Sequence, residues 1–181
     1  SMDMEGYGRS TRPPPMADAC NIAPSVQPKY VPKPLAAPCA VPFKRPITTM
    51  GSDWNDISAV VDRLLEQTGE KQLSIVAWSQ GGPRSFGYTL AHPDKVARLV
   101  ELAPAYNRGM PTNAPDPLPA PEGPMTVQSE ADFKANWDRQ APCPGQYEPA
   151  AFQSVWSEML ASDPVGAGWG DGVRRAPAVP S

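Results

Sequence analysis

Hydrophobic positions in the middle of the chain follow helix and strand patterns in alternation. Ser52 and Asp53 can each cap a helix, and six apolar side chains then recur at helical spacing: Trp54, Ile57, Val60, Val61, Leu64 and Leu65. We predict an amphipathic helix over about 53–67, ended by Gly69. A second helix is predicted over 79–91, where His92 and Pro93 stop it.

Two short apolar segments alternate with these helices. Residues 73–77 form an apolar run flanked by polar residues, a pattern typical of a strand buried on both faces of a parallel sheet. Residues 96–103 are rich in Val and Leu and precede Pro104, which favours a second buried strand. The order helix, strand, helix, strand predicts the α/β class.

The flanking segments are poor in regular patterns. The range 13–46 carries ten prolines and is predicted to be a long extended loop, and the range 104–124 is a second Pro-rich loop. Two further helices are expected, and no strand is expected between them and the sheet. The first rests on Ala131, Phe133 and Trp137, and the second on Phe152, Val155, Trp156, Met159 and Leu160. The Gly-rich tail after Asp163 is predicted to be irregular.

Charge and composition exclude several function classes. The 181 residues carry 16 Lys and Arg against 19 Asp and Glu, a net charge of −3 without a basic face, which argues against nucleic-acid binding. No apolar run approaches the roughly 20 residues that a membrane crossing needs. No leader is visible in this chain, so a cytoplasmic and a secreted location both stay open.

The three cysteines give no metal-binding pattern. Cys20, Cys39 and Cys143 form no closely spaced pair, and the sequence has a single His, so we expect neither a metal nor another cofactor. Cys20 and Cys39 enclose a short Pro-rich stretch, where a disulfide and two free thiols both remain open. Cys143 would be left over in either case.

The junction between the first predicted strand and the following helix carries candidate chemistry. Ser79 stands there with Ala77 two positions before it and Gly81 two positions after it. Small residues at these places allow the sharp, strained turn of a nucleophile elbow, which exposes the serine hydroxyl above the sheet. The N–H of Gln80 can then donate to an oxyanion at the positive end of the helix.

This stretch resembles the α/β-hydrolase superfamily. The resemblance rests on residues 77–82 (Ala-Trp-Ser-Gln-Gly-Gly), on Tyr88, on residues 92–96 and 99–104, and on residues 3–13, which look like the family's loop after its fourth strand. It implies part of a parallel α/β-hydrolase sheet with flanking helices over 1–112. Over 113–181 it implies a partial helical cap with an irregular tail.

The resemblance also implies an esterase or lipase-like serine hydrolase, with Ser79 as nucleophile and Gln80 as one oxyanion donor. His92, the single imidazole, would lie roughly 20 Å from Ser79 along one helix and is interpreted as a helix-ending residue. Glu101, Asp163 and Asp171 are the nearest internal acids, and none fits the expected place of a triad acid. We therefore expect the catalytic Asp and His outside this chain.

Aromatic residues beside the predicted site have two interpretations each. Trp78 can floor an acyl pocket or belong to the core, and Tyr7 and Tyr106 can contact ligand or simply pack their loops. Trp137 and Trp156 are interpreted mainly as packing residues. Arg174 and Arg175, next to Asp171, are interpreted as a solvated charge cluster, with a carboxylate-binding role as the alternative.

The sequence hypothesis is a hydrolase of small-molecule carboxylic esters, with peptidase activity as a second option and little activity in this chain alone. The alternative is a non-catalytic fragment or pseudoenzyme with at most a binding role. Neither nucleic acid nor a membrane span is expected. Unpaired strand edges are expected to favour self-association.

Overall fold

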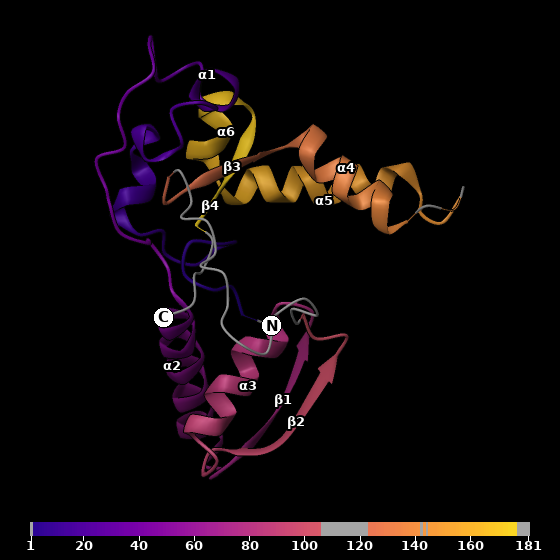
Figure 1. Ribbon diagram of the computed structural model, residues 1–181. Coiled ribbons are helices and arrows are strands. Elements are labelled where there is room, and N and C mark those ends of the chain that lie inside the picture. Colours follow the sequence, from indigo (N-terminus) through magenta and orange to yellow (C-terminus); the bar gives the residue numbers. More distant parts are fainter. Residues whose placement is uncertain (1, 106–122, 142, 144, 177–181) are drawn as a thin grey trace, which may run out of the picture. The chain divides into compact units, whose positions relative to one another are not determined.

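A computed structural model describes the chain except for residues 1, 106–122, 142, 144 and 177–181, and it forms two compact units (Figure 1). The first contains the described residues of Asp3–Thr48 and Pro121–Ala178, and the second contains those of Thr49–Ala120. The division expected from the sequence, at residue 112, groups the chain differently. In the structure the Pro-rich N-terminal segment packs with the C-terminal helices.

The second unit consists of two helices and two strands: α2 (Met50–Thr68), β1 (Leu73–Trp78), α3 (Gly81–Ala91) and β2 (Val96–Leu102). Each follows the element predicted from the hydrophobic pattern to within a few residues. The N-cap of α2 is Thr49, whose side chain forms a reciprocal capping box with Ser52, so the cap is neither Ser52 nor Asp53. The helix ends at Gly69, whose φ of 73° suits glycine.

The two strands of this unit pair in parallel, with Ile75 opposite Leu99 and Trp78 opposite Leu102. Helix α3 connects them, as in a βαβ unit. Parallel pairing places both strand ends at one edge of the sheet, where Ser79 follows β1. The predicted α/β class, with a small parallel sheet and flanking helices, is confirmed.

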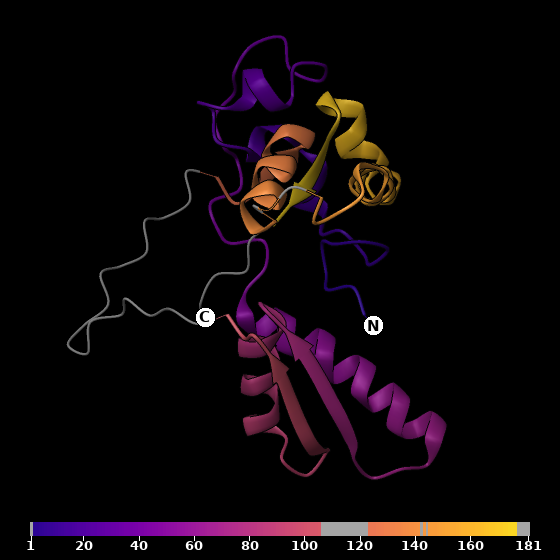
Figure 2. The ribbon, with the colours of Figure 1, turned by 90° about the vertical axis from the view of Figure 1, so that its right-hand side faces the viewer.

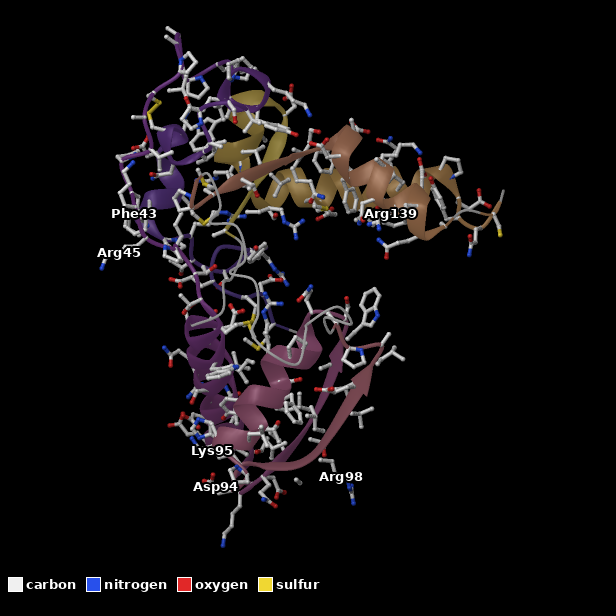
Figure 3. All side chains as sticks on the ribbon, in the orientation of Figure 1. Phe43, Arg45, Asp94, Lys95, Arg98 and Arg139 are labelled. Carbon is white, nitrogen blue, oxygen red and sulfur yellow. A yellow bond between two sulfur atoms is a disulfide. The ribbon has the colours of Figure 1, made fainter. Side chains whose placement is uncertain are left out.

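One face of this sheet is uncovered. Helices α2 and α3 lie on the same side of the strands, and Figure 2 shows the strands in front of them. Ala77 and Val96 are buried, whereas Val76 is 77% and Trp78 71% exposed. Arg98 also extends from β2 away from the helices (Figure 3). Within the second unit, the prediction of strands buried on both faces is therefore wrong, because both of its described helices lie on the other face.

The first unit contains short helical turns, four helices and an antiparallel strand pair. Its elements are the 3-10 turns Pro14–Ala17 and Ala19–Asn21, α1 (Gln27–Tyr30), β3 (Thr126–Ser129), α4 (Glu130–Gln140), α5 (Pro149–Ser162), α6 (Pro164–Gly170) and β4 (Gly172–Arg175). Strands β3 and β4 pair antiparallel. Helices α4 and α5 confirm the two predicted helices.

Two expectations for this unit were wrong. Strand β3 precedes α4 where no strand was expected, and the Gly-rich tail forms α6 and β4 instead of an irregular segment. Each strand has four residues and a single apolar one, Val127 or Val173, so no alternation of apolar and polar positions is visible in the sequence. Asp163 is the N-cap of α6, and its side chain accepts a hydrogen bond from the Gly166 N–H.

Two apolar clusters form the core of the first unit. One is built from the N-terminal segment, β3 and α6, by Met16, Ala19, Ile22, Val31, Met125, Val127, Trp169 and Ala176. The other lies between α4, α5 and β4, where Phe133 stacks on Phe152 and Trp156 with ring centroids 5.6 and 5.8 Å apart. The interpretation of Trp156 as a packing residue is confirmed by its burial.

A disulfide between Cys20 and Cys39 closes the Pro-rich segment, which decides between the two possibilities left open by the sequence. The buried Gln27 side chain supports it. Its amide donates to the carbonyl oxygens of Ile22 (2.8 Å) and Cys39 (3.0 Å), and its oxygen accepts from the Cys39 N–H (2.8 Å). Because these bonds replace those of a regular helix or sheet, a segment rich in proline is held in one conformation.

A buried ion pair links the C-terminal strand to the rest of the first unit. The Arg174 guanidinium donates to both carboxylate oxygens of Asp163, which is fully buried, and also to the Met16 carbonyl. Arg12 approaches the same carboxylate at 3.5 Å. The interpretation of Arg174 as part of a solvated charge cluster is wrong, because its partner lies 11 residues away and the pair is enclosed by the core.

Candidate active site

The backbone of Ser79 has the geometry that a nucleophile elbow requires. Its φ is 52°, in the left-handed region that residues other than glycine rarely adopt. It lies between the last residue of β1 and the first turn of α3. A Cβ placed on Gly81 would lie 3.6 Å from the Cβ of Ala77, so the two small neighbours do approach each other across the turn.

Hydrogen bonds fix the peptide that joins Ser79 to Gln80. The Ser79 carbonyl accepts from the N–H groups of Gly82 (3.0 Å) and Ala105 (2.8 Å), and the Ser79 N–H donates to the Leu102 carbonyl (3.1 Å). In a trans peptide the N–H points opposite to the carbonyl. The Gln80 N–H is therefore directed away from both donors and is held in one orientation.

The segment after β2 completes this turn. A Cβ on Gly82 would overlap Pro104, so glycine is needed for the start of α3 to approach the end of β2. Ala103 also has a positive φ of 44°. Together these residues bring the N–H of Ala105 to the Ser79 carbonyl. The start of α3 lies at the positive end of the helix dipole, which favours negative charge beside Ser79.

An ion pair that sequence reasoning missed lies next to the elbow. Arg84 on α3 donates through Nε to the carboxylate of Asp53 on α2, and through Nη1 to the Gln80 carbonyl at 3.0 Å. The Asp53 side chain is 3% exposed. The two residues are 31 positions apart, and no periodicity links them.

No complete triad is found among the described residues of this unit. His92 ends α3 as its C-cap, at the opposite end of the helix from Ser79, and its ring lies 4.6 Å from that of Tyr88. Its interpretation as a helix-ending residue is confirmed. Glu101 lies on β2 opposite Ala77, and its buried Oε1 has no hydrogen-bond partner among the described residues. Asp163 and Asp171 belong to the first unit.

The other predicted site residues are distributed over the chain. Trp78 adjoins Ser79 and is exposed at the end of β1, so it is not a core residue here. Tyr7 lies in the first unit, where its hydroxyl donates to the Ala176 carbonyl at 2.9 Å and its ring faces the Arg175 guanidinium. Tyr106 lies outside the described residues.

A hollow of about 500 Å³ lies in the first unit, at the connection between α4 and α5. Lys134, Asp138 and Tyr147 form a hydrogen-bonded group in its wall. The hydrogen bond from Lys134 and, to a smaller extent, the hydrogen bond from Tyr147 hold the pKa of Asp138 below its usual value of 3.8. None of the predicted site residues lines this hollow.

Two general findings bear on cofactors and membranes. Within the described part of the chain, no three His, Cys, Asp or Glu side chains gather as metal ligands would. Among the described helices, none combines the length and the apolar character that crossing a membrane requires.

Comparison with known proteins identifies the family. The family model described as the alpha/beta hydrolase fold matches residues 1–141, which include Ser79 and both strands of the parallel sheet. Searches of curated proteins and of solved structures gave no significant match. The match supports a hydrolase-type function. With its strand, sharp turn and helix around Ser79, this chain belongs to the α/β-hydrolase fold family.

Proposed function

We propose that the protein is a serine hydrolase that cleaves carboxylic esters through an acyl-enzyme on Ser79. The observation that carries this proposal is the left-handed backbone of Ser79 between β1 and α3, with the following peptide fixed by hydrogen bonds from Gly82 and Ala105. Strain of this kind clusters at functional sites. An ordinary turn from a strand to a helix does not need a serine in it.

The mechanism assigns separate roles to Ser79 and Gln80. The Ser79 hydroxyl loses its proton to a base and forms a bond to the carbonyl carbon, and the carbonyl electrons move onto oxygen. The Gln80 N–H donates to this oxyanion, with the dipole of α3 adding to the stabilisation. Collapse of the intermediate breaks the bond to the leaving alcohol, which takes up the proton. Water then repeats the sequence to release the acid.

The base is proposed to be a histidine outside these 181 residues, together with its orienting acid. His92 ends α3 far from Ser79, and a base must come within about 3 Å of the proton that it takes. The chain alone is therefore expected to hydrolyse activated esters hardly faster than solvent. An alcohol leaves more readily than an amine, which favours esters over peptides.

Substrate contacts are proposed for three aromatic residues. Trp78 offers an exposed apolar surface directly beside Ser79, suited to an acyl chain. Tyr7 and Tyr106 are proposed as further contacts, and helices α4 and α5 as part of a cap. A small-molecule ester remains the proposed partner.

A second candidate is a non-catalytic role in binding. The observation that favours it is the placement of the single histidine at the far end of α3. In that case the uncovered apolar face of β1 and β2 would be the functional surface.

The decisive experiment uses the gene product that carries these residues, assayed with a chromogenic short-chain ester and a fluorophosphonate probe. We expect the probe on Ser79, and loss of both labelling and hydrolysis in Ser79→Ala. Ser74→Ala is the matched control, since Ser74 is an exposed serine of β1, the strand that precedes Ser79. Hydrolysis that survives Ser79→Ala would overturn the proposal in favour of another nucleophile.

A further inference from the structure

The Arg84 guanidinium connects two backbone regions that are distant in sequence. Through Nε it is paired with Asp53 in the first turn of α2, and through Nη1 it donates to the carbonyl of Gln80, the N-cap of α3. One side chain thus joins the start of α2 to the residue that follows Ser79. Arginine can do this because its planar fork presents several donors in fixed directions.

Burial distinguishes this pair from the surface ion pairs of the chain. The Asp53 side chain is 3% exposed and that of Arg84 is 20% exposed. A charge-assisted hydrogen bond that is shielded from water is stronger and less mobile than an exposed one. Arg63 and Glu66, by contrast, are both more than 60% exposed and lie within one helix.

The held carbonyl lies next to the proposed oxyanion donor. Hydrogen bonds to the Ser79 carbonyl fix the peptide before Gln80, and Arg84 fixes the peptide after it. With both peptide planes held, the backbone of Gln80 cannot rotate, and its N–H keeps one direction. Preorganised donors of this kind need no rearrangement when negative charge develops.

We propose that Asp53 and Arg84 are positioning residues of the hydrolase site, which hold the Gln80 backbone so that its N–H is aimed at the reacting carbonyl oxygen. This inference rests on the proposed function for its catalytic consequence. The backbone constraint itself can be tested without any activity.

A purely structural role predicts a different response to substitution. If the pair only fastened α3 to α2, Arg84→Lys would restore it, because an ammonium group can still pair with Asp53. A lysine lacks the fork that binds Asp53 and the Gln80 carbonyl together. The positioning role therefore predicts that Arg84→Lys frees the backbone of Gln80 as much as Arg84→Met does.

The chain provides a matched control at the other end of the same two helices. Lys95, which follows α3 and is labelled in Figure 3, pairs with Asp62 of α2 at 2.6 Å. Asp62→Asn removes an ion pair that also links α2 to the α3 and β2 region, but at the end away from the elbow. The effect of Asp62→Asn therefore measures what an ion pair between these elements contributes without any contact to Gln80.

The first measurement is amide hydrogen exchange in the full 181-residue chain. Arg84→Met, Arg84→Lys and Asp53→Asn are each expected to speed exchange of the Gly82 N–H, which donates to Ser79, by about tenfold or more. Exchange at the C-terminal end of α3 should stay unchanged. Rescue by Arg84→Lys, or equal acceleration in Asp62→Asn, would overturn the proposal.

The second measurement is steady-state ester hydrolysis by the gene product that carries the chain. Arg84→Lys is expected to lower kcat by roughly 10 to 100-fold with KM nearly unchanged, because the affected interaction forms in the transition state. A rise in KM alone, or an unchanged kcat, would overturn the proposed effect on catalysis. Absence of any hydrolysis that depends on Ser79 would instead overturn the proposed function, and the exchange result would still decide the backbone constraint.

Discussion

The two units of this protein are stabilised in different ways. The second unit is regular, with two helices packed on two parallel strands, yet one face of its sheet exposes Val76, Val100 and Leu102 at 77, 54 and 63%. The first unit has many short segments and loops, yet it buries Asp163 completely and contains a disulfide. Regular secondary structure and a closed core are thus separate properties.

The difference shows where specific interactions replace periodic packing. In the first unit, side chains such as Gln27 and Arg174 satisfy backbone groups that regular elements would pair among themselves. In the second unit the backbone is paired in helices and strands, and its own described helices cover only one face of the sheet. Each unit should therefore respond to a different kind of perturbation.

The largest effect is expected when the buried ion pair of the first unit is broken. Asp163→Asn leaves the Arg174 guanidinium buried without a charged partner and should lower the free energy of unfolding by about 3–5 kcal/mol. Urea unfolding of the variant, with hydrogen exchange to locate the change, measures this. Asp62→Asn is the exposed control. If α2 and α3 lost protection as much as α5 and α6, the two units would not be independent.

Reduction of the disulfide is expected to rank second. The bridge joins residues 19 positions apart, and opening a loop of this length should lower stability by about 3 kcal/mol. The double variant Cys20→Ser with Cys39→Ser should show this without a reductant, in the first unit only. Cys143→Ser, which removes the exposed free thiol, is the control. An unchanged urea midpoint in the double variant would mean that Gln27 and its hydrogen bonds suffice.

Acid should weaken the first unit through the same carboxylate. Burial raises the pKa of Asp163, but the hydrogen bonds and the charge of Arg174 together lower it by more. The pKa of Asp163 in the folded protein is therefore below 3.8. The resulting stabilisation is present above the unfolded value of 3.8 and is lost as the pH falls through the folded pKa. Urea titrations from pH 7 to pH 3 should show a steeper decline for the native chain than for Asp163→Asn. Parallel curves would contradict the shift.

The smallest change in stability is expected on the uncovered sheet face. The double variant Val76→Thr with Val100→Thr alters exposed positions that face each other in the register, and should change stability by no more than about 0.5 kcal/mol. It should still reduce self-association, which we propose occurs through this face and the strand edges. Sedimentation velocity would measure the reduction. The buried Val61→Thr is the control that should cost stability instead.

The sequence predicted the second unit better than the first for a physical reason. Apolar residues at helical spacing and in short runs reflect burial over many positions, so α2, β1, α3 and β2 could be recognised. Strands β3 and β4 have four residues each, and their pairing brings the side chains of Gln128 and Arg175, 47 positions apart, into a hydrogen bond. No local pattern contains that information.

The same limit applies to the candidate site. Ser79 could be found because its requirements, small residues two positions away on either side, are local. Asp53 and Arg84 could not, because a charged residue on a helix ordinarily indicates solvent and its partner lies on another helix. Likewise, the exposure of Trp78 depends on what covers the sheet, which hydrophobicity alone does not reveal.

The positive φ of Ser79 lowers the stability of the fold at the position that carries the proposed nucleophile. A left-handed conformation costs a residue with a Cβ about 1–2 kcal/mol, and glycine would avoid most of that cost. Glycine, however, has no hydroxyl. A search for stabilising substitutions would therefore select against the serine, and a more stable version of this turn would be one that has lost its nucleophile.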